Sequence, residues 1–460
     1  MSLTNVSASF QEKFPEATEF WNLKSLYLEL AKQKLNSTGR ETELTPVEKA
    51  CLRGLLCGYS PKEIAAVVNW TCGAISVELT KGLYRYVEAL TERESNTLKT
   101  WRNIPKWLEA AGYKTPAPRQ DWGEAPDVSA FYGRTEELNT LKQCIRQKGC
   151  RLVALLGMGG IGKTSLAAKL VKDIQDDFDF IVWRSLRHAP PLKQMLASLI
   201  PLLSNQQPCS VLEDTNLLIS QFIECLRVRR CLVVFDDIEM LMRSCDRAGH
   251  YREEYESYSD LMRQLSQQPH QSCLLFNSWE KPLEMELLEN KTCCACSLKL
   301  DGLPFKAARQ ILEAHNLSGS EPEWYRLITI YRGNPLALNI AATTIKEFFH
   351  GSISEFFSLN TLIISEPLKA ILFEHLSRLD GSERQVMCYL ATHHQPVSLN
   401  QLRNYFNLKE FAPLNSASQL INVLQSLERR SIIEKIANTS EMAFTLQPSV
   451  MKVTKEYCNV

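Results

Sequence analysis

The sequence predicts a multidomain protein whose central part has an α/β fold, a parallel sheet with flanking helices, between two largely helical parts. At 460 residues the chain exceeds the usual size of one hydrophobic core. Strands that are buried on both faces of a parallel sheet form short, almost continuous apolar runs separated by helical patterns. The chain has such runs at residues 152–156, 180–183, 232–235 and 273–276.

Proline and glycine mark the boundary before this central part. Residues 114–130 contain three prolines and one glycine. Both residue types interrupt helices and strands, so this segment is the best candidate for a linker. After about residue 300 amphipathic helical patterns dominate, until a short extended segment at residues 442–446.

Charge and hydropathy restrict the function classes. Lysine plus arginine (52) equals aspartate plus glutamate (52), so the chain lacks the overall positive charge of a dedicated nucleic-acid binder. No apolar run approaches the roughly 18 residues of a membrane-spanning helix. The first residues lack the basic and apolar blocks of a signal peptide. We therefore expect a cytoplasmic protein without a membrane partner.

Fifteen cysteines are spread along the chain rather than arranged as a small disulfide scaffold. Cys293 and Cys296 have one C-x-x-C spacing, with Cys294 between them, but no second pair of ligands is nearby in the sequence. We favour buried structural thiols over a metal or redox site here.

A phosphate-binding loop follows the first central apolar run. Gly157-Met158-Gly159-Gly160-Ile161-Gly162-Lys163-Thr164-Ser165 matches G-x-x-x-x-G-K-[ST] without a gap, and apolar residues at helical spacing follow it. In such a loop, backbone amides and a helix N-terminus surround the phosphates, and the lysine adds charge at the β/γ positions. The sequence thus predicts an α/β P-loop NTPase core that binds ATP or ADP. Its predicted contacts are Gly157, Gly159, Gly160, Ile161, Gly162, Lys163, Thr164 and Ser165.

A magnesium site is predicted from a second strand end. Residues 232–235 are apolar and lead directly into Asp236 and Asp237. We expect Asp236 to hold Mg²⁺ together with the Thr164 hydroxyl, and Asp237 to orient or deprotonate an attacking water as the catalytic residue. Two acids after a strand can also simply cap the next helix.

Across most of residues 40–455 the chain resembles the NB-ARC branch of the STAND signalling ATPases, in particular bacterial members with an N-terminal helix-turn-helix of the vWA-MoxR-associated type. Besides the two phosphate-site motifs, residues 131–136 (FYGRTE) are similar to a family motif that lines the adenine pocket. Residues 333–338 (GNPLAL) look like the family's G-x-P-L motif. The resemblance implies that Arg134 and Pro335 lie at the adenine.

Two departures from the family pattern affect the chemistry. Where many members have a Met-His-Asp motif whose histidine contacts the ADP β-phosphate, this sequence has Leu446-Gln447-Pro448. Gln447 can donate one neutral hydrogen bond but brings no charge. Trp279 stands where the family usually has a γ-phosphate-sensing arginine. Because an arginine there stabilises transferring phosphate, we expect at most a slow ATPase.

The N-terminal part resembles the three-helix unit of response-regulator transcription factors. Thr45 and Pro46 are a suitable N-cap and first-turn residue for a helix that ends before Gly58. Residues 44–87 carry five basic and three acidic side chains, a modest surplus for DNA binding. A protein-docking module is therefore favoured over DNA binding through residues 44–90, and both remain open.

The resemblance also implies a domain order and a mode of action. The expected order is a helical domain at 1–113 with a helix-turn-helix core at 44–90, a linker at 114–130, an NB-ARC nucleotide-binding domain at 131–300, a helical ARC subdomain at 301–362 and a winged-helix subdomain at 363–460. We expect an ATP/ADP switch that exposes the N-terminal module, associates with itself on activation, and serves a protein effector or sensor chain. The alternatives are an ATP-responsive, DNA-binding transcriptional regulator and a nucleotide-binding scaffold that does not hydrolyse ATP.

Overall fold

The computed structural model describes residues 13–15, 17–38, 43–98, 100–114, 119–204, 214–291, 294–359, 362–393, 395–407, 416–437 and 441–458. The chain divides into two compact units, Met1–Arg119 and Gln120–Val460, and the division falls within the predicted linker. None of the helices in the described ranges combines the length and apolar character that crossing a bilayer requires.

In the first unit, the secondary-structure elements of the described residues before β1 are all helices. Its helices are α2 (Ala17–Phe20), α3 (Leu23–Thr38), α4 (Pro46–Leu56), α5 (Pro61–Val67), α6 (Cys72–Glu78), the π-helical η1 (Leu79–Leu83), α7 (Tyr84–Leu90) and α8 (Asn103–Ala110). The predicted cap of α4 is confirmed, because the Thr45 side chain accepts the Glu48 N–H and the Glu48 carboxylate accepts the Thr45 N–H. Apolar faces of these helices form a separate core.

A six-stranded sheet with the order β1-β3-β4-β5-β2-β6 organises the second unit. The strands are β1 (Arg119–Asp121), β2 (Leu152–Leu156), β3 (Phe180–Ser185), β4 (Cys231–Asp236), β5 (Cys273–Ser278) and β6 (Ala295–Lys299). The pairs β2·β5, β2·β6, β3·β4 and β4·β5 are parallel. The predicted α/β P-loop NTPase fold is confirmed. The sequence did not indicate β6, since this edge strand is only partly buried and mixes polar with apolar residues.

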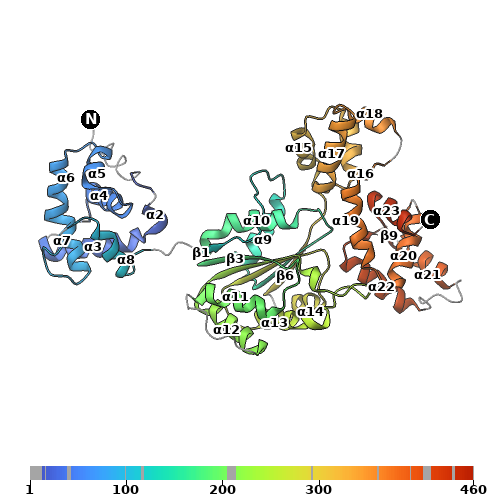
Figure 1. Cartoon of the computed structure of the whole chain (residues 1–460), viewed down its shortest axis with the longest axis horizontal. Coiled ribbons are helices and arrows are strands. Elements are labelled where there is room, and N and C mark those ends of the chain that lie inside the picture. Colours follow the sequence, from blue (N-terminus) through green and yellow to red (C-terminus); the bar gives the residue numbers. More distant parts are fainter. Residues whose placement is uncertain are drawn as a thin grey trace. The chain divides into compact units, whose positions relative to one another are not determined.

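Helices cover both faces of this sheet (Figure 1). We call the sheet together with these helices the sheet domain. α9 (Thr135–Arg146) and α10 (Lys163–Ile174) pack on one face. α11 (Leu192–Ser204), α12 (Thr215–Val228) and α13 (Glu256–Gln267) pack on the other. The remaining elements are η2 (Gln175–Asp177), η3 (Ile238–Leu241), η4 (Glu253–Tyr255) and α14 (Leu283–Lys291).

Two further parts follow the sheet domain and share one apolar core. The middle helices are α15 (Phe305–Ala314), α16 (Glu321–Ile330), α17 (Pro335–Phe348) and α18 (Ile353–Ser358). The C-terminal part comprises α19 (Glu366–Ser377), α20 (Gly381–Thr392), β7 (Val397–Ser398), α21 (Leu399–Asn407), α22 (Ala417–Arg429), β8 (Glu434–Ala437), β9 (Met442–Thr445) and α23 (Pro448–Cys458). Its strands form a small sheet in the order β7-β9-β8. A disulfide between Cys388 and Cys458 joins α20 to α23.

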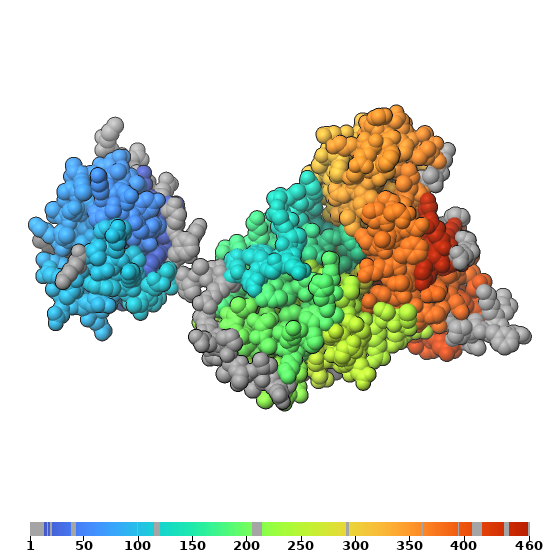
Figure 2. Space-filling view, in the orientation of Figure 1, coloured from blue at the N-terminus to red at the C-terminus, as the bar shows by residue number. Residues whose placement is uncertain are grey.

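The carboxyl ends of the central strands lie at one edge of the large sheet, because neighbouring strands are parallel. Gly157 follows β2, Asp236 ends β4 and Ser278 ends β5. Ligands of open α/β sheets bind at this edge. The middle helices and the C-terminal part, orange to red in Figure 2, lie against the sheet domain. A hydrogen bond from the Lys281 N–H to the Arg429 carbonyl is one of their direct contacts.

Candidate nucleotide-binding site

The loop between β2 and α10 contains the predicted phosphate-binding residues. Gly162 has a φ of 98°, in the left-handed region that glycine adopts easily, and α10 begins directly after it. N–H groups in the first turn of a helix have no intrahelical acceptor, so this turn favours an anion. The predicted contacts all lie on the loop or in that turn: Gly157, Gly159, Gly160, Ile161, Gly162, Lys163, Thr164 and Ser165.

The Lys163 ammonium lies at the beginning of the loop. Its Nζ donates to the carbonyls of Gly157, at 2.9 Å, and Met158, at 3.2 Å. Burial lowers the pKa of Lys163, while the carboxylates of Glu239 and Asp236 favour its charged form. In loops of this sequence the lysine reaches the β- and γ-phosphates. The Gly157–Met158 side is therefore the β/γ end of the loop.

The two predicted magnesium ligands lie next to each other. The Thr164 Oγ1 donates to the Asp236 Oδ1 at 3.2 Å, and the Asn277 Nδ2 donates to the same oxygen at 2.9 Å. Burial raises the pKa of Asp236, and the charge of Asp237 adds to this effect. A hydroxyl and a carboxylate are oxygen ligands of the kind that Mg²⁺ prefers. Bound there, the ion would neutralise phosphate charge.

Asp237 occupies an unusual backbone position beside this pair. Its φ is 61°, a left-handed conformation that few residues other than glycine adopt. The Ser185 Oγ donates to its Oδ2 at 3.4 Å, and the Arg187 Nε lies 3.6 Å from the same oxygen. These contacts hold the carboxylate at the end of β4. Its predicted role in activating water stays a prediction.

A cavity of about 360 Å³ opens at the other end of the loop. Its lining includes Phe131, Tyr132, Arg134, Gly162, Ser165 and Pro335. The buried Arg134 guanidinium donates to the Ile161 carbonyl at 2.9 Å and to Glu137 at 2.7 Å, which anchors the segment before α9 to the loop. The fold thus brings together Arg134 and Pro335, the two residues predicted to lie at the adenine.

Gly159 connects the loop to both of the following parts of the chain. Its N–H donates to the His375 Nε2, on α19, at 3.2 Å. Its carbonyl accepts from the Asn334 Nδ2 at 3.1 Å, and Asn334 also caps α17 through its Oδ1. A Cβ at residue 159 would lie 2.9 Å from the His375 Nε2, so only glycine fits without a shift.

An aromatic pair lies at the β/γ end of the loop. Trp279 follows β5 and is 6% exposed, and its ring centroid is 3.8 Å from that of His375. Burial lowers the pKa of His375 well below its ordinary value, and the positive charges of Lys163 and Arg378 lower it further. The imidazole is therefore neutral, which allows its Nε2 to accept the Gly159 N–H.

A buried ionic network continues from this pair into the C-terminal part. The Glu280 Oε2 lies 2.7 Å from the Arg430 Nη1, and the Arg430 Nε lies 3.3 Å from the Glu383 Oε1. All three side chains are buried. Removing one member of such a network leaves an uncompensated buried charge, which is strongly destabilising. The segment after β5 is thus fixed to α20 and α22 as well as to α19.

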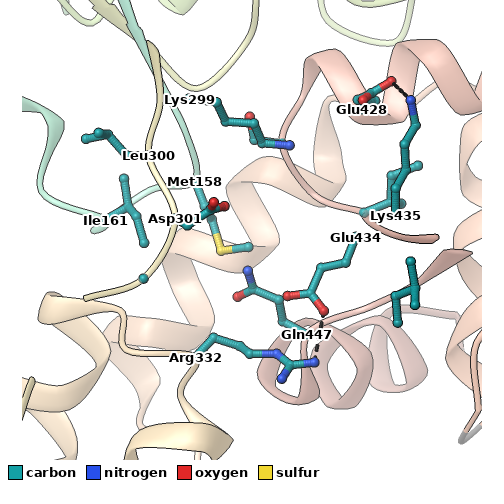
Figure 3. A pocket seen from close by; sticks show the side chains of 14 residues that line it. Met158, Ile161, Lys299, Leu300, Asp301, Arg332, Glu428, Glu434, Lys435 and Gln447 are labelled. Atoms are coloured by element: carbon teal, nitrogen blue, oxygen red, sulfur yellow. Dashed lines mark hydrogen bonds and ion pairs between the residues drawn. The ribbon is translucent and has the colours of Figure 1, made fainter. Parts of the chain in front are cut away.

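Gln447 lies in a different cleft, of about 610 Å³, on the Met158 side of the loop (Figure 3). In the same cleft an ion pair of 2.9 Å between Arg332 and Glu434 joins the middle helices to the C-terminal part. Among the described residues, the Gln447 side chain makes no hydrogen bond to the loop backbone. Its predicted hydrogen bond to a β-phosphate stays a prediction.

Sequence reasoning missed the residues that approach the loop from outside the sheet domain. His375 is a single histidine on an amphipathic helix, and nothing in its surroundings distinguishes it. Likewise, nothing in the sequence around Arg430, at the end of α22, indicates that it pairs with Glu280. Asn334 could have been found as a helix N-cap before Pro335, since asparagine is favoured there, but its second bond to the loop could not.

Comparison with known proteins identifies an NB-ARC domain at residues 134–247. A WD repeat-containing protein of Nostoc sp., itself uncharacterised, is 39% identical over 351 residues, which is 74% of this chain and 27% of that protein. The chain thus spans about a quarter of this relative's length. The disease resistance protein RPS4B of Arabidopsis thaliana is 33% identical over 126 residues, 25% of this chain and 10% of that protein.

Two solved structures are similar to this chain at low sequence identity and low TM-score. A Walker-type ATPase of Pyrococcus abyssi is 14% identical with a TM-score of 0.49, over 73% of this chain and 99% of that one. A STAND protein of Pyrococcus horikoshii with a tetratricopeptide repeat sensor is 17% identical with a TM-score of 0.37, over 73% of this chain and 44% of that one.

Proposed function

We propose that this chain is a STAND-type signalling switch that is operated by exchange of ADP for ATP. The observation on which the proposal depends is the double anchoring of Gly159, by Asn334 from the middle helices and by His375 from the C-terminal part. A ligand can shift a conformational equilibrium only through contacts that differ between the two states. A phosphate bound in this loop has such contacts, because the loop backbone also holds the two other parts.

The cavity at Arg134 and Pro335 suits the base and sugar of the nucleotide. It is lined by apolar and aromatic side chains from the segment before α9 and from the middle helices, with few polar groups. Nucleotide bases are held by surfaces of this kind. From there the diphosphate would extend along the loop amides toward Lys163, with Thr164 and Asp236 as ligands of Mg²⁺.

In the closed arrangement of the structure, the diphosphate is the better fit. His375 contacts the loop at Gly159 and Trp279 packs on His375, at the end of the loop where a third phosphate would have to lie. A triphosphate would therefore have to displace His375, and with it α19. The conformational change that follows ATP binding is, on this proposal, the release of the C-terminal part from the sheet domain.

The ionic network around Glu280 would stabilise the closed state until a triphosphate displaces His375 and α19. Glu280 lies one residue after Trp279, so a movement of the indole also disturbs the pair with Arg430. In the open state these charges would be hydrated instead of paired. The switch would then have two discrete states, each of which satisfies the same charged groups in a different way.

Hydrolysis would be slow at best. Trp279 cannot supply the positive charge that stabilises phosphoryl transfer, although Asp237 is placed beside Asp236 where a water could be activated. We therefore assign Asp237 a role in resetting the switch rather than in rapid turnover.

We assign the C-terminal part as a winged-helix subdomain, because it combines the helices α20–α22 with the small sheet β7-β9-β8. The first unit would be the output module of the switch. We favour self-association and protein docking through residues 44–90. DNA binding is the second candidate, because Lys81 and Arg85 are exposed one turn apart. Affinity for duplex DNA that falls steeply with added salt would favour it.

The proposal is tested on the purified full chain with ADP and with a non-hydrolysable ATP analogue. We expect a larger radius of gyration in small-angle scattering, or a higher particle mass, with the ATP analogue. The Lys163→Ala variant should show neither change. If the scattering profile and the mass were identical with both nucleotides, the chain would not be a switch, even if it bound both.

A further inference from the structure

Three cysteine thiols converge at the opposite end of β2 from the phosphate loop. Cys144 lies in the last turn of α9, Cys150 precedes β2 and Cys296 lies on β6. Their Sγ atoms all lie within 4.8 Å of one another. The sequence had drawn attention to Cys296 only through its spacing from Cys293, which lies outside the described residues. The fold instead surrounds Cys296 with sulfur atoms from two other segments.

The main chain fixes this convergence. The Cys150 N–H donates to the Cys144 carbonyl at 3.0 Å, which closes the turn between α9 and β2. The Leu152 N–H donates to the Cys294 carbonyl at 3.1 Å, so the beginning of β2 is also bonded to the segment that leads into β6. The positions of the three Cα atoms thus follow from the backbone hydrogen bonds and do not depend on one side-chain rotamer.

The surroundings favour a ligand that binds sulfur. Cys144 is 5% exposed and Cys150 is 3% exposed, whereas Cys296 is half-buried because β6 is the edge strand. The neighbouring members of this core are apolar and include Leu141, Ile145, Val153 and Leu298. Thiols are weak hydrogen-bond donors and acceptors, and in the thiolate form they bind metal ions strongly. The half-buried edge gives an ion a route to the site.

The three thiols interact directly with one another. Hydrogen bonds from Cys296 and then Cys144 lower the pKa of Cys150, and the hydrogen bond with Cys150 raises the pKa of Cys296. The thiolate is the form of cysteine that binds metals, so metal binding must displace the thiol protons.

We propose that Cys144, Cys150 and Cys296 together bind one Zn²⁺ ion. Thiolate ligands select soft or borderline cations such as Zn²⁺ over Mg²⁺ and Ca²⁺. At a Zn–S distance of about 2.3 Å, three sulfurs around one ion lie about 4 Å apart, which small side-chain rotations can reach. Binding releases the three thiol protons to solvent, and a water on the Cys296 side completes the tetrahedral shell.

The ion would be structural and independent of the proposed function. It would connect the edge strand β6 to α9 and to the beginning of β2. β6 continues into the connection to the middle helices, where the Leu300 N–H donates to the Leu156 carbonyl at 2.8 Å. Zinc would thus strengthen the edge of the sheet from which this connection leaves, without contact to the phosphate loop.

The test uses the full chain, purified under reducing conditions without chelator. Elemental analysis should find close to one equivalent of zinc, and Cd²⁺ added to the metal-free chain should produce a thiolate charge-transfer absorption. Cys150→Ser should weaken Zn²⁺ binding at least about 100-fold. Even mutation of a residue that only supports a metal ligand lowers metal affinity about 10- to 100-fold. Cys231→Ser is the matched control, a buried cysteine at the start of β4 outside the cluster.

Two results would overturn the proposal. The first is a reduced, folded wild-type chain that holds no zinc and shows no Cd²⁺ absorption. The second is a disulfide between Cys150 and Cys296 in the purified chain, which would make the cluster a redox pair. If Cys150→Ser does not fold, Cys296→Ala at the sheet edge replaces it, with zinc-dependent protection of the wild-type thiols from alkylation as a further measurement. Nucleotide binding is measured in parallel, so that loss of zinc and loss of the switch are distinguished.

Discussion

The two ends of the phosphate loop differ in what lies against them. At the Gly162 end a cavity of about 360 Å³ is open to a ligand. At the Gly159 end the His375 Nε2 accepts the Gly159 N–H at 3.2 Å, and the Trp279 ring packs on the imidazole with the ring centroids 3.8 Å apart. One loop thus combines an open binding surface with a contact to another part of the chain. If the proposed function holds, this difference teaches that nucleotide affinity and domain closure would depend on different residues, which mutation would separate.

Arg430→Met should have the largest effect on the stability of the closed form, because it removes the cation that joins Glu280, next to Trp279, to Glu383. The buried Glu383 would lose its cation, and Glu280 would keep only the more distant Arg378, at 3.7 Å, at a cost of about 3–5 kcal/mol to the closed form. We expect a lower melting temperature and a scattering profile shifted toward the open state without any nucleotide. Arg429→Met is the control, since its partner Glu286 is 48% exposed and a surface pair contributes little. Equal effects of the two variants would show that the network does not hold the closed form.

Lys163→Ala should weaken the binding of ADP and of the ATP analogue by a similar factor, because both nucleotides have a β-phosphate for the ammonium to contact. Losing a charged donor to phosphate costs about 2–3 kcal/mol. Calorimetry should therefore show ADP and the ATP analogue weakened by a similar factor, about 30- to 150-fold. Lys169→Ala, further along α10 and paired with Asp173, is the control and should bind normally. Undiminished binding by Lys163→Ala would remove the basis of the nucleotide site.

Trp279→Ala should change nucleotide affinity least of the three variants, but it should be the one that changes the preference between the ATP analogue and ADP. Without the indole, the β/γ end of the loop gains room for a third phosphate. We expect affinity for the ATP analogue to rise about tenfold relative to ADP, or about 1.4 kcal/mol. Trp279→Arg should in addition raise the ATPase rate, because it supplies a cation.

Tyr389→Ala is the control for the ring itself, since Tyr389 also packs on a histidine, His393, with centroids 4.3 Å apart. It should leave the preference between the nucleotides unchanged. A wild-type chain that binds ADP and the ATP analogue equally well, with the same ratio in Trp279→Ala, would contradict the proposed role of the packed end.

The sequence was sufficient for the phosphate and magnesium residues and insufficient for the residues that contact the loop from the C-terminal part. Lys163, Thr164 and Asp236 follow from short motifs whose chemistry is local, so their meeting at the sheet edge could be predicted from parallel strands. The bond between Gly159 and His375 spans 216 residues of sequence. It depends on how a helix from the C-terminal part packs, which no local pattern encodes. Trp279 could be predicted to lack charge, but not to stack on a histidine.

The cap of α17 has a mechanical consequence. The Asn334 Oδ1 accepts N–H groups of α17, while its Nδ2 donates to the Gly159 carbonyl. The Leu336 N–H also donates to the Gly160 carbonyl at 3.3 Å. If these two bonds to the loop break, the cap is retained, so the helix keeps its end intact while it leaves the loop. In the proposed switch α17 would therefore move as one rigid helix, and a displacement at the loop would reach its far end without unravelling its first turn.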